Sequence, residues 1–160
     1  MSKYVLFKRV TDVELEQAEE DSDLAHELIE RDSSDDAEHT LWAFAGLQFL
    51  LDAEGMGIVV GWPDTPDELQ IVLLADGETI FGLDSNTVAR IATDLGATPF
   101  RRLGAHFDRA AMAADDVNPS DWSGWDTEEA LNFLNEAYDD LVKFMMSTAG
   151  ASSALLMEMP

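Results

Sequence analysis

Residues 126–159 read DTEEALNFLNEAYDDLVKFMMSTAGASSALLMEM. Apolar residues recur in the first part of this stretch at spacings of three and four, which predicts a long helix with one broad apolar face. Asp126 with Glu129 predicts a capping box at its start, and Gly150 predicts a left-handed exit at its end. The run 151–159 has the length and apolarity of a buried strand. We therefore expect this helix and strand to form the core around which the rest of the chain folds.

The composition is that of one soluble domain. The chain has 160 residues, 46% of them hydrophobic, which suits a single domain with a substantial core over residues 1–160. It has no cysteine, so disulfides, zinc–thiolate sites and a cysteine nucleophile are excluded. The sequence shows neither a signal peptide nor an apolar run near the ~18 residues of a membrane span. We expect a cytoplasmic protein without a cofactor.

Acidic residues dominate the charge. There are 33 Asp and Glu against 9 Lys and Arg, which gives a formal net charge of -24. Such a field repels nucleic acid, anionic lipid and phosphorylated substrates, and it speeds encounter with basic partners. Direct binding to nucleic acid or to a membrane is therefore not expected. Two explanations stay open, an acidic binding face or adaptation to a salty interior, and the scarcity of lysine (Lys3, Lys8 and Lys143) fits both.

The N-terminal part predicts a strand followed by acidic helices. Residues 4–10 alternate as a strand does. Thr11 and Glu14 have the spacing of a second capping box, so a helix should start there. From 12 to 38 acidic residues crowd around a narrow apolar stripe that is broken near residues 21–23. This pattern predicts an acidic helical hairpin, or one bent helix, on the surface.

The middle of the chain mixes helices with a hairpin. Residues 37–51, which include Trp42, are nearly all apolar in their second half and predict a buried helix. Asp76-Gly77 stands between two β-rich runs and predicts a hairpin turn. Ser85 predicts the cap of a helix that Gly96 closes.

A short helix is expected after Thr98-Pro99, and residues 115–125 are expected to form a loop before the long helix. Neither repeats nor linkers are visible. Together these elements predict an α+β fold, a single compact domain in which a small mixed or antiparallel sheet packs against several helices.

Several short motifs resemble a known family. They are FAGLQFLL at 44–51, GLDSNTV at 82–88, Phe107-Asp108 with Met112, VNPSDW at 117–122, and the closing helix, glycine and apolar strand. Together they resemble the YfbM-like family of small bacterial proteins, a domain of unknown function, and the resemblance implies an α+β fold. The chain departs from the family pattern at Phe44, at Leu47-Gln48-Phe49 and at Asn118-Pro119, where relatives tend to have tryptophan, Leu-His-Phe and Tyr-Pro. Chemistry by that histidine or tyrosine in relatives could not occur here.

Catalytic and metal signatures are weak. His26 with Glu27 and Glu30 superficially resembles a zinc-protease helix, yet Glu30 stands where the second histidine is needed. A weak metal-dependent hydrolase that uses these three residues stays an alternative. We interpret His39 as a helix-start or pairing residue, and His106 as a helix-end histidine. The sequence contains neither a phosphate-binding loop nor a nucleophile elbow, so an enzyme is not the leading hypothesis.

Loop tryptophans among acidic residues suggest a binding surface. Trp62, Trp122 and Trp125 fall in predicted loops, where they could anchor a partner inside an acidic rim or simply cover the core. The leading hypothesis is a non-enzymatic acidic protein-binding module, of inhibitor or immunity type, that neutralises a basic toxin or nuclease. The alternative is an uncharacterised cytoplasmic domain with a salt-adapted surface. The predicted contact residues are Glu16, Glu19, Glu20, Asp21, Asp23, Glu27, Glu30 and the three tryptophans.

Overall fold

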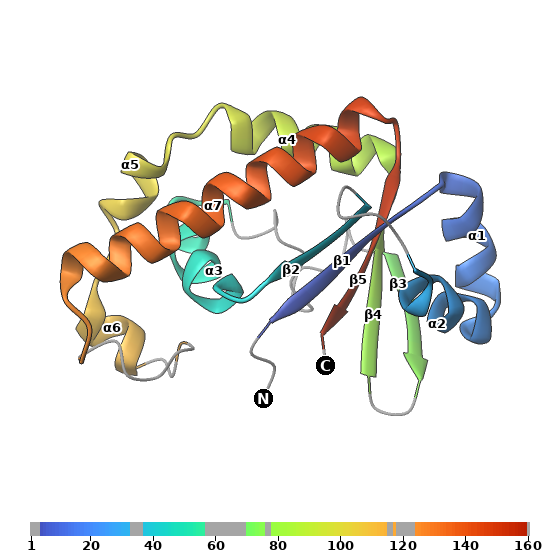
Figure 1. Ribbon diagram of the computed structural model, residues 1–160, viewed down its shortest axis with the longest axis horizontal. Helices are drawn as coiled ribbons and strands as arrows, with labels where there is room; N and C mark the ends of the chain where they lie inside the picture. Colours follow the sequence, from blue (N-terminus) through green and yellow to red (C-terminus); the bar gives the residue numbers. More distant parts are fainter. Residues whose placement is uncertain are drawn as a thin grey trace.

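The computed structural model describes residues 4–32, 37–56, 70–75, 78–114, 117 and 124–159. In this part of the chain seven helices and five strands form an α+β fold, which confirms the predicted class (Figure 1). The strands are β1 (Val5–Val10), β2 (Glu38–Leu41), β3 (Gln70–Ala75), β4 (Glu78–Leu83) and β5 (Ala154–Met159). The helices are α1 (Asp12–Glu20), α2 (Ser22–Glu30), α3 (Phe44–Ala53), α4 (Ser85–Gly96), α5 (Phe100–Gly104), α6 (Arg109–Ala114) and α7 (Thr127–Gly150).

The strands form one antiparallel sheet in the order β2-β1-β5-β4-β3. The last of them, β5, lies at the centre of the sheet and pairs with β1 on one side and β4 on the other. The strand predicted within residues 151–159 is therefore confirmed. The predicted hairpin is confirmed as the β3–β4 pair, although its turn residues, Asp76 and Gly77, lie outside the described residues.

Successive residues of the central strands point into two separate apolar cores, because side chains alternate between the faces of a sheet. On β5, Leu155 and Met157 belong to the larger core, whereas Ala154 and Leu156 belong to the smaller one. Helix α7 contributes to the larger core, and the α1–α2 hairpin closes the smaller one. The sheet therefore lies between two helical layers (Figure 1).

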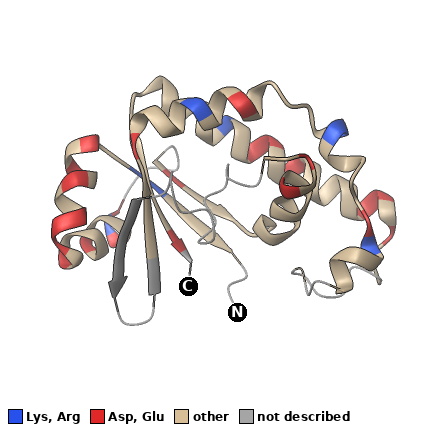
Figure 2. Ribbon diagram, turned by 180° about the vertical axis from the view of Figure 1, so that it is seen from behind, with Lys and Arg blue, Asp and Glu red and all other residues tan. Residues whose placement is uncertain are grey.

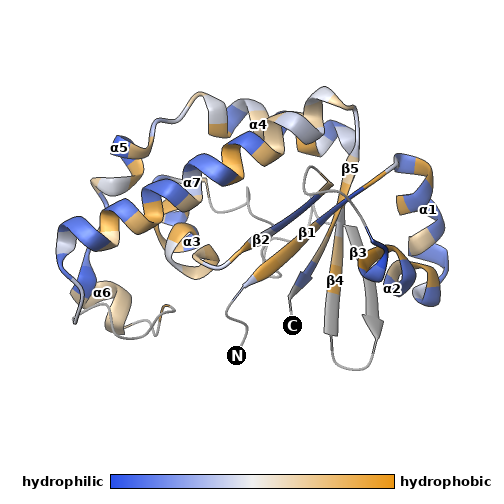
Figure 3. Cartoon of the chain, in the orientation of Figure 1, coloured by the Kyte–Doolittle hydropathy of each residue, from blue (hydrophilic) through white to orange (hydrophobic). Residues whose placement is uncertain are grey.

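Helix α7 covers the larger core with the face that its apolar spacing predicts. Its buried residues are Ala130, Leu134, Tyr138, Leu141, Phe144, Met145 and Thr148. Figure 3 shows hydrophilic and hydrophobic residues alternating along this helix, as an amphipathic helix requires. The central role predicted for the long helix and the following strand is thus confirmed in the packing.

The predicted acidic hairpin is confirmed as α1 and α2. Thr11 and Glu14 form the predicted capping box, since the Thr11 hydroxyl accepts from the Glu14 N–H and the Glu14 carboxylate accepts from the Thr11 N–H, both at 3.0 Å. Asp21 ends α1 and caps α2, where its carboxylate accepts from the Asp23 N–H at 3.0 Å. The break between the helices falls where the sequence predicts it.

The ends of α7 differ from the predictions. Asp126 is the N-cap residue, but its side chain makes no capping hydrogen bond, so the predicted box with Glu129 is wrong. Gly150 belongs to the helix, and the left-handed turn comes two residues later at Ser152, where φ is 52°. A left-handed conformation costs a residue with a side chain roughly 1–2 kcal/mol. Local hydrogen bonds hold this turn, because the Ser152 N–H donates to the Ala149 carbonyl at 3.0 Å and the Ser153 N–H donates to the Thr148 carbonyl at 3.1 Å.

The sequence predicted one helix over residues 37–51, and this prediction is wrong. Their first part contains strand β2, and α3 begins only at Phe44. Trp42, predicted within the buried helix, is 62% exposed. The strand forms because its backbone pairs with β1, a distant partner that local periodicity does not reveal. The predicted burial of the second half is confirmed, since Leu47, Leu50 and Leu51 are fully buried.

Smaller differences concern helix ends. Asp84, not Ser85, caps α4, because its carboxylate accepts from the Thr87 N–H at 2.8 Å. Helix α5 begins directly after Pro99, as predicted. Helix α6 was not predicted, and most of the predicted loop 115–125 lies outside the described residues.

Candidate functional site

The acids of the predicted partner-binding face lie together on the α1–α2 hairpin. All seven are exposed: Glu16, Glu19, Glu20, Asp21, Asp23, Glu27 and Glu30. Figure 2 shows Asp and Glu spread over both of these short helices. The opposite sides of the helices, which include Leu15 and Leu28, pack into the smaller core. The acids are therefore presented by an element that is held firmly against the sheet.

Two cations near the hairpin are already engaged inside the fold. Arg31 Nη1 donates to Glu14 Oε2 at 2.6 Å. Burial alone would raise the pKa of Glu14, but the Thr11 N–H and Arg31 outweigh it and lower that pKa. Lys8 is 1% exposed, and its Nζ donates to the Arg31 carbonyl and, at 2.9 Å, to Glu38 Oε2. In these contacts neither cation pairs with any of the seven exposed acids.

Acids are not confined to the hairpin. Helix α7, the longest described helix, exposes Glu128, Glu129, Glu136, Asp139 and Asp140 (Figure 2). Charge of one sign therefore covers parts of both helical layers, which is also the pattern that a salt-adapted surface predicts.

None of the helices in the described ranges is both long and apolar enough to cross a membrane.

The predicted tryptophan anchors do not share one environment. Trp125 is half-buried at the edge of the larger core, where its ring packs edge-on against Phe133 with 5.3 Å between centroids. Trp62 and Trp122 lie outside the described residues. Trp42 is instead an exposed aromatic, with its ring 4.6 Å from that of Tyr4. Trp125 thus covers the core, which is the simpler of the two interpretations that its sequence position allowed.

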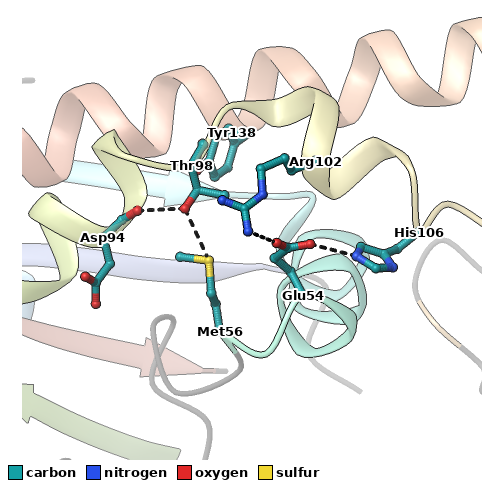
Figure 4. Close-up of polar contacts among 7 residues, drawn as sticks. All are labelled: Glu54, Met56, Asp94, Thr98, Arg102, His106 and Tyr138. Atoms are coloured by element: carbon teal, nitrogen blue, oxygen red, sulfur yellow. Dashed lines mark hydrogen bonds and ion pairs between the residues drawn. The ribbon is translucent and has the colours of Figure 1, made fainter.

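A charged cluster joins the end of α3 to α5 (Figure 4). The Glu54 carboxylate accepts from the Arg102 guanidinium and lies 2.7 Å from His106 Nε2. The Glu54 side chain is only 13% exposed. The hydrogen bond with His106 is the largest influence on Glu54, and together with Arg102 it lowers the pKa of this carboxyl against the opposing effect of burial. The cluster fixes the ring orientation of His106.

Glu54→Gln is expected to destabilise the protein more at neutral pH than in acid. Because the folded-state pKa of Glu54 lies below its ordinary value of 4.5, its contribution is complete above that value and is lost as the pH falls through the folded-state pKa. Urea unfolding of both proteins from about pH 7 to pH 3 measures this difference. Glu136→Gln, an exposed acid on α7, controls for the change in net charge. A Glu54→Gln effect that is constant over this range would contradict the assignment.

Beside this cluster, Tyr138 holds the turn between α4 and α5 (Figure 4). Its hydroxyl oxygen lies 2.7 Å from the Thr98 carbonyl oxygen and 3.0 Å from that of Leu95, so one O–H is shared between two acceptors. The Thr98 hydroxyl donates to the Asp94 carbonyl at 2.9 Å. Burial, followed by the charge of Asp139, raises the pKa of Tyr138 to about 12.

Tyr138→Phe is expected to remove an alkaline loss of stability. The ordinary tyrosine pKa is 10.0 and the folded-state value is about 12, so the wild-type free energy of unfolding falls as the pH rises between these values, by about 2–3 kcal/mol. At neutral pH the variant is less stable by about 1–2 kcal/mol, because buried carbonyls lose their donor. Urea unfolding from about pH 8 to pH 12 measures both effects, and parallel pH profiles of the two proteins would refute them.

The candidate metal residues on α2 do not form a site. His26 is half-buried, and Glu27 and Glu30 are exposed. Across the described ranges, no group of three or more His, Asp or Glu is arranged to hold a metal ion. The hydrolase alternative therefore has no supporting geometry in this part of the chain.

The other two histidines lie in contrasting places. His39 is on β2, with its ring stacked on Phe144 at 5.3 Å between centroids. Burial lowers the pKa of His39, against the opposing charge of Asp140. His106 follows α5, near a helix end as predicted, and is tied to Glu54.

Sequence analysis missed Glu54, Arg102 and Arg109 as parts of a polar region. One signal was available, since residues 101–109 carry three arginines and a histidine in a strongly acidic chain. Arg102 and His106 contact Glu54 across about fifty positions of the chain, and no periodicity marks these contacts.

The protein is an α+β domain whose antiparallel sheet lies between a helical hairpin and a layer with a long helix. A family model described as a domain of unknown function, DUF1877, matches residues 1–158, and the chain belongs to this family. The crystal structure of YfbM from Escherichia coli, a protein of unknown function, has the same fold, with a TM-score of 0.73 and 11% identity over 98% of this chain and 99% of that one. The predicted resemblance is confirmed. None of the curated proteins matches the chain.

Proposed function

We propose that this protein is a non-enzymatic binding module that engages a basic protein through the exposed acids of the α1–α2 hairpin. In its finer form, the proposal is a cytoplasmic inhibitor or immunity-type protein that covers the cationic cleft of a toxin or nuclease. The observation that carries the proposal is the presentation of seven exposed carboxylates by two short helices anchored in one core.

Electrostatic steering favours the hairpin as the docking face. A dense acidic surface speeds encounter with a basic partner and disfavours acidic competitors. The Debye length is about 8 Å at physiological salt, so charges close to the interface contribute most. Because Ala25, Leu28 and Ile29 anchor α2 in the smaller core, binding requires little ordering of the backbone.

Affinity also needs contacts that exclude water, since exposed ion pairs contribute only about 0.2–1 kcal/mol each. Val13, 62% exposed on α1, offers an apolar contact within the acidic face. Trp62 and Trp122 keep their proposed role as anchors, whereas the ring of Trp125 packs against Phe133 inside the fold.

The proposal is tested by pull-down from lysate of the source organism with three tagged proteins, at low and high KCl. The hairpin variant carries Glu16→Gln, Glu19→Gln, Glu20→Gln and Glu27→Gln. The α7 variant carries Glu128→Gln, Glu129→Gln, Glu136→Gln and Asp139→Asn, all exposed, and loses the same number of charges. We expect one basic protein to be retained at low salt by the wild type and the α7 variant, lost with the hairpin variant, and bound again after purification.

Two outcomes would reject the proposal. Equal loss with both variants would mean that net charge alone attracts the captured protein. Failure to retain any specific protein at either salt concentration would remove the reason to regard the hairpin as a binding face.

A second candidate rests on the acids of α7. Five exposed acids on the opposite helical layer fit a domain whose surface is adapted to high salt. This candidate predicts a melting temperature that climbs steeply as KCl is raised. The binding-module proposal predicts a small rise that levels off once the exposed charges are screened.

A further inference from the structure

Three of the nine lysine and arginine residues lie in one short segment of this acidic protein. Residues 101–109 hold Arg101, Arg102, Arg109 and His106, against Asp108 as the acid in the same segment. Figure 2 shows the arginines of α5 and α6 at the end of the molecule away from the α1–α2 hairpin. The region is therefore separate from the proposed partner-binding face.

A wide, open depression of about 690 Å³ lies within this region. Its lining combines polar and apolar groups: Ala105, His106, Phe107, Asp108, Arg109, Ala110, Ala113 and Thr127. An apolar wall with a few convergent polar groups is typical of sites for small organic ligands.

The two nitrogen-bearing side chains of the depression are held by neighbours. Glu54 engages His106 Nε2 at 2.7 Å, which fixes the ring and leaves Nδ1 outside that bond. Nδ1 is a second donor when the imidazole is protonated, and that is the form in which His106 would bind a carboxylate. Arg109 Nη1 donates to the Trp125 carbonyl. A guanidinium has five N–H donors. The bond to the Trp125 carbonyl anchors Arg109 and uses one of these donors, so the other four lie outside this bond. Fixed donors bind an anion at a smaller entropic cost than mobile ones do.

The acid in the lining, Asp108, keeps its negative charge but directs one carboxylate oxygen to backbone donors. Asp108 Oδ1 accepts from the N–H groups of Ala110 and Ala111, both at 3.1 Å, so its carboxylate is committed to the start of α6. Thr127 adds a hydroxyl that can donate or accept.

We propose that this depression binds a small organic monocarboxylate, with the carboxylate at Arg109 and His106 and the apolar part against Phe107 and the alanines. The fork of a guanidinium matches the two oxygens of a carboxylate. A net charge of -24 opposes a dianion more strongly than a monoanion, which disfavours phosphate. The alanine and phenylalanine wall favours an organic acid over an inorganic ion. This inference does not depend on the proposed function.

The test is NMR titration of the full chain with benzoate, and separately with inorganic phosphate, at constant ionic strength. We expect saturable shifts of the His106 ring and of backbone amides in residues 105–113 and 127 with benzoate, and weaker binding of phosphate. Arg109→Gln should weaken benzoate binding at least tenfold. Arg101→Gln removes the same charge from an exposed α5 position outside the lining, and should change the affinity less than twofold.

Several results would overturn the inference. They are shifts that do not saturate, shifts centred elsewhere, phosphate binding as tight as benzoate, or equal weakening by the two arginine substitutions. If Arg109→Gln does not fold, the wild-type spectra decide alone, because the location and saturation of the shifts and the order of the two probes need no variant.

Discussion

Leu155→Ala is expected to lower the free energy of unfolding by about 2–5 kcal/mol. Leu155 is fully buried on β5, the central strand, and it belongs to the larger core beneath α7. Removing its methyl groups loses apolar burial and leaves a cavity where the sheet and the long helix meet. Urea unfolding, with equal m-values as the check that the unfolded states are comparable, measures the loss.

Met146→Ala is the matched control, because it shortens an apolar side chain on α7 that is 55% exposed. Its effect should stay within about 0.5 kcal/mol. A Leu155→Ala effect as small as that of the control would show that β5 is not packed as described, and that the C-terminal strand is not part of the central core.

Lys8→Ala is expected to lower the free energy of unfolding by about 3 kcal/mol, whereas the free energy of unfolding of Lys8→Met should stay within about 1 kcal/mol of the wild-type value. Lys8 is 1% exposed and ties the end of α2, through the Arg31 carbonyl, to Glu38 at the start of β2. Alanine removes both the bonds and the buried aliphatic stem. Methionine keeps most of the stem volume, and the Glu38 side chain, which is 40% exposed, can be solvated in its absence.

Thermal and urea unfolding of both Lys8 variants measure this difference, with Lys143→Ala, an exposed lysine on α7, as the control. If methionine is as costly as alanine, the ion pair rather than the packing of the stem dominates at this position. If neither variant loses stability, Lys8 does not join the hairpin to the sheet.

Local signals were sufficient for much of the fold. The Thr11 and Glu14 box and the break in the apolar stripe near residues 21–23 place the hairpin correctly, because each depends on residues that are close in the chain. The apolar spacing of α7 and the run at β5 were also decisive, since an amphipathic helix and a buried strand have different periods.

Prediction from the sequence failed where contacts with a distant part of the chain decide the local structure. Residues 38–41 form a strand only because β1 lies beside them, and the apolar run that follows made the whole segment resemble a helix. Gly150 has the residue type of a helix stop, yet the helix continues through it and the left-handed turn comes at Ser152, so residue type alone does not mark the turn.

Site prediction was limited in the same way. The acidic face followed from composition and helical spacing, and its residues are exposed as an interaction surface requires. The Glu54, Arg102 and His106 cluster joins side chains that are separated by about fifty positions, so only packing of α3 against α5 reveals it.

The most direct measurement of the central proposal is the dissociation constant of the purified basic partner for the hairpin variant and for the α7 variant. Four neutralised contact charges should weaken binding by roughly 1–3 kcal/mol, which is about 5-fold to 160-fold, for the hairpin variant alone. Its affinity should also fall less steeply with salt, and the α7 variant should bind within about twofold of the wild type. Equal weakening of the two variants would contradict a binding face on the hairpin.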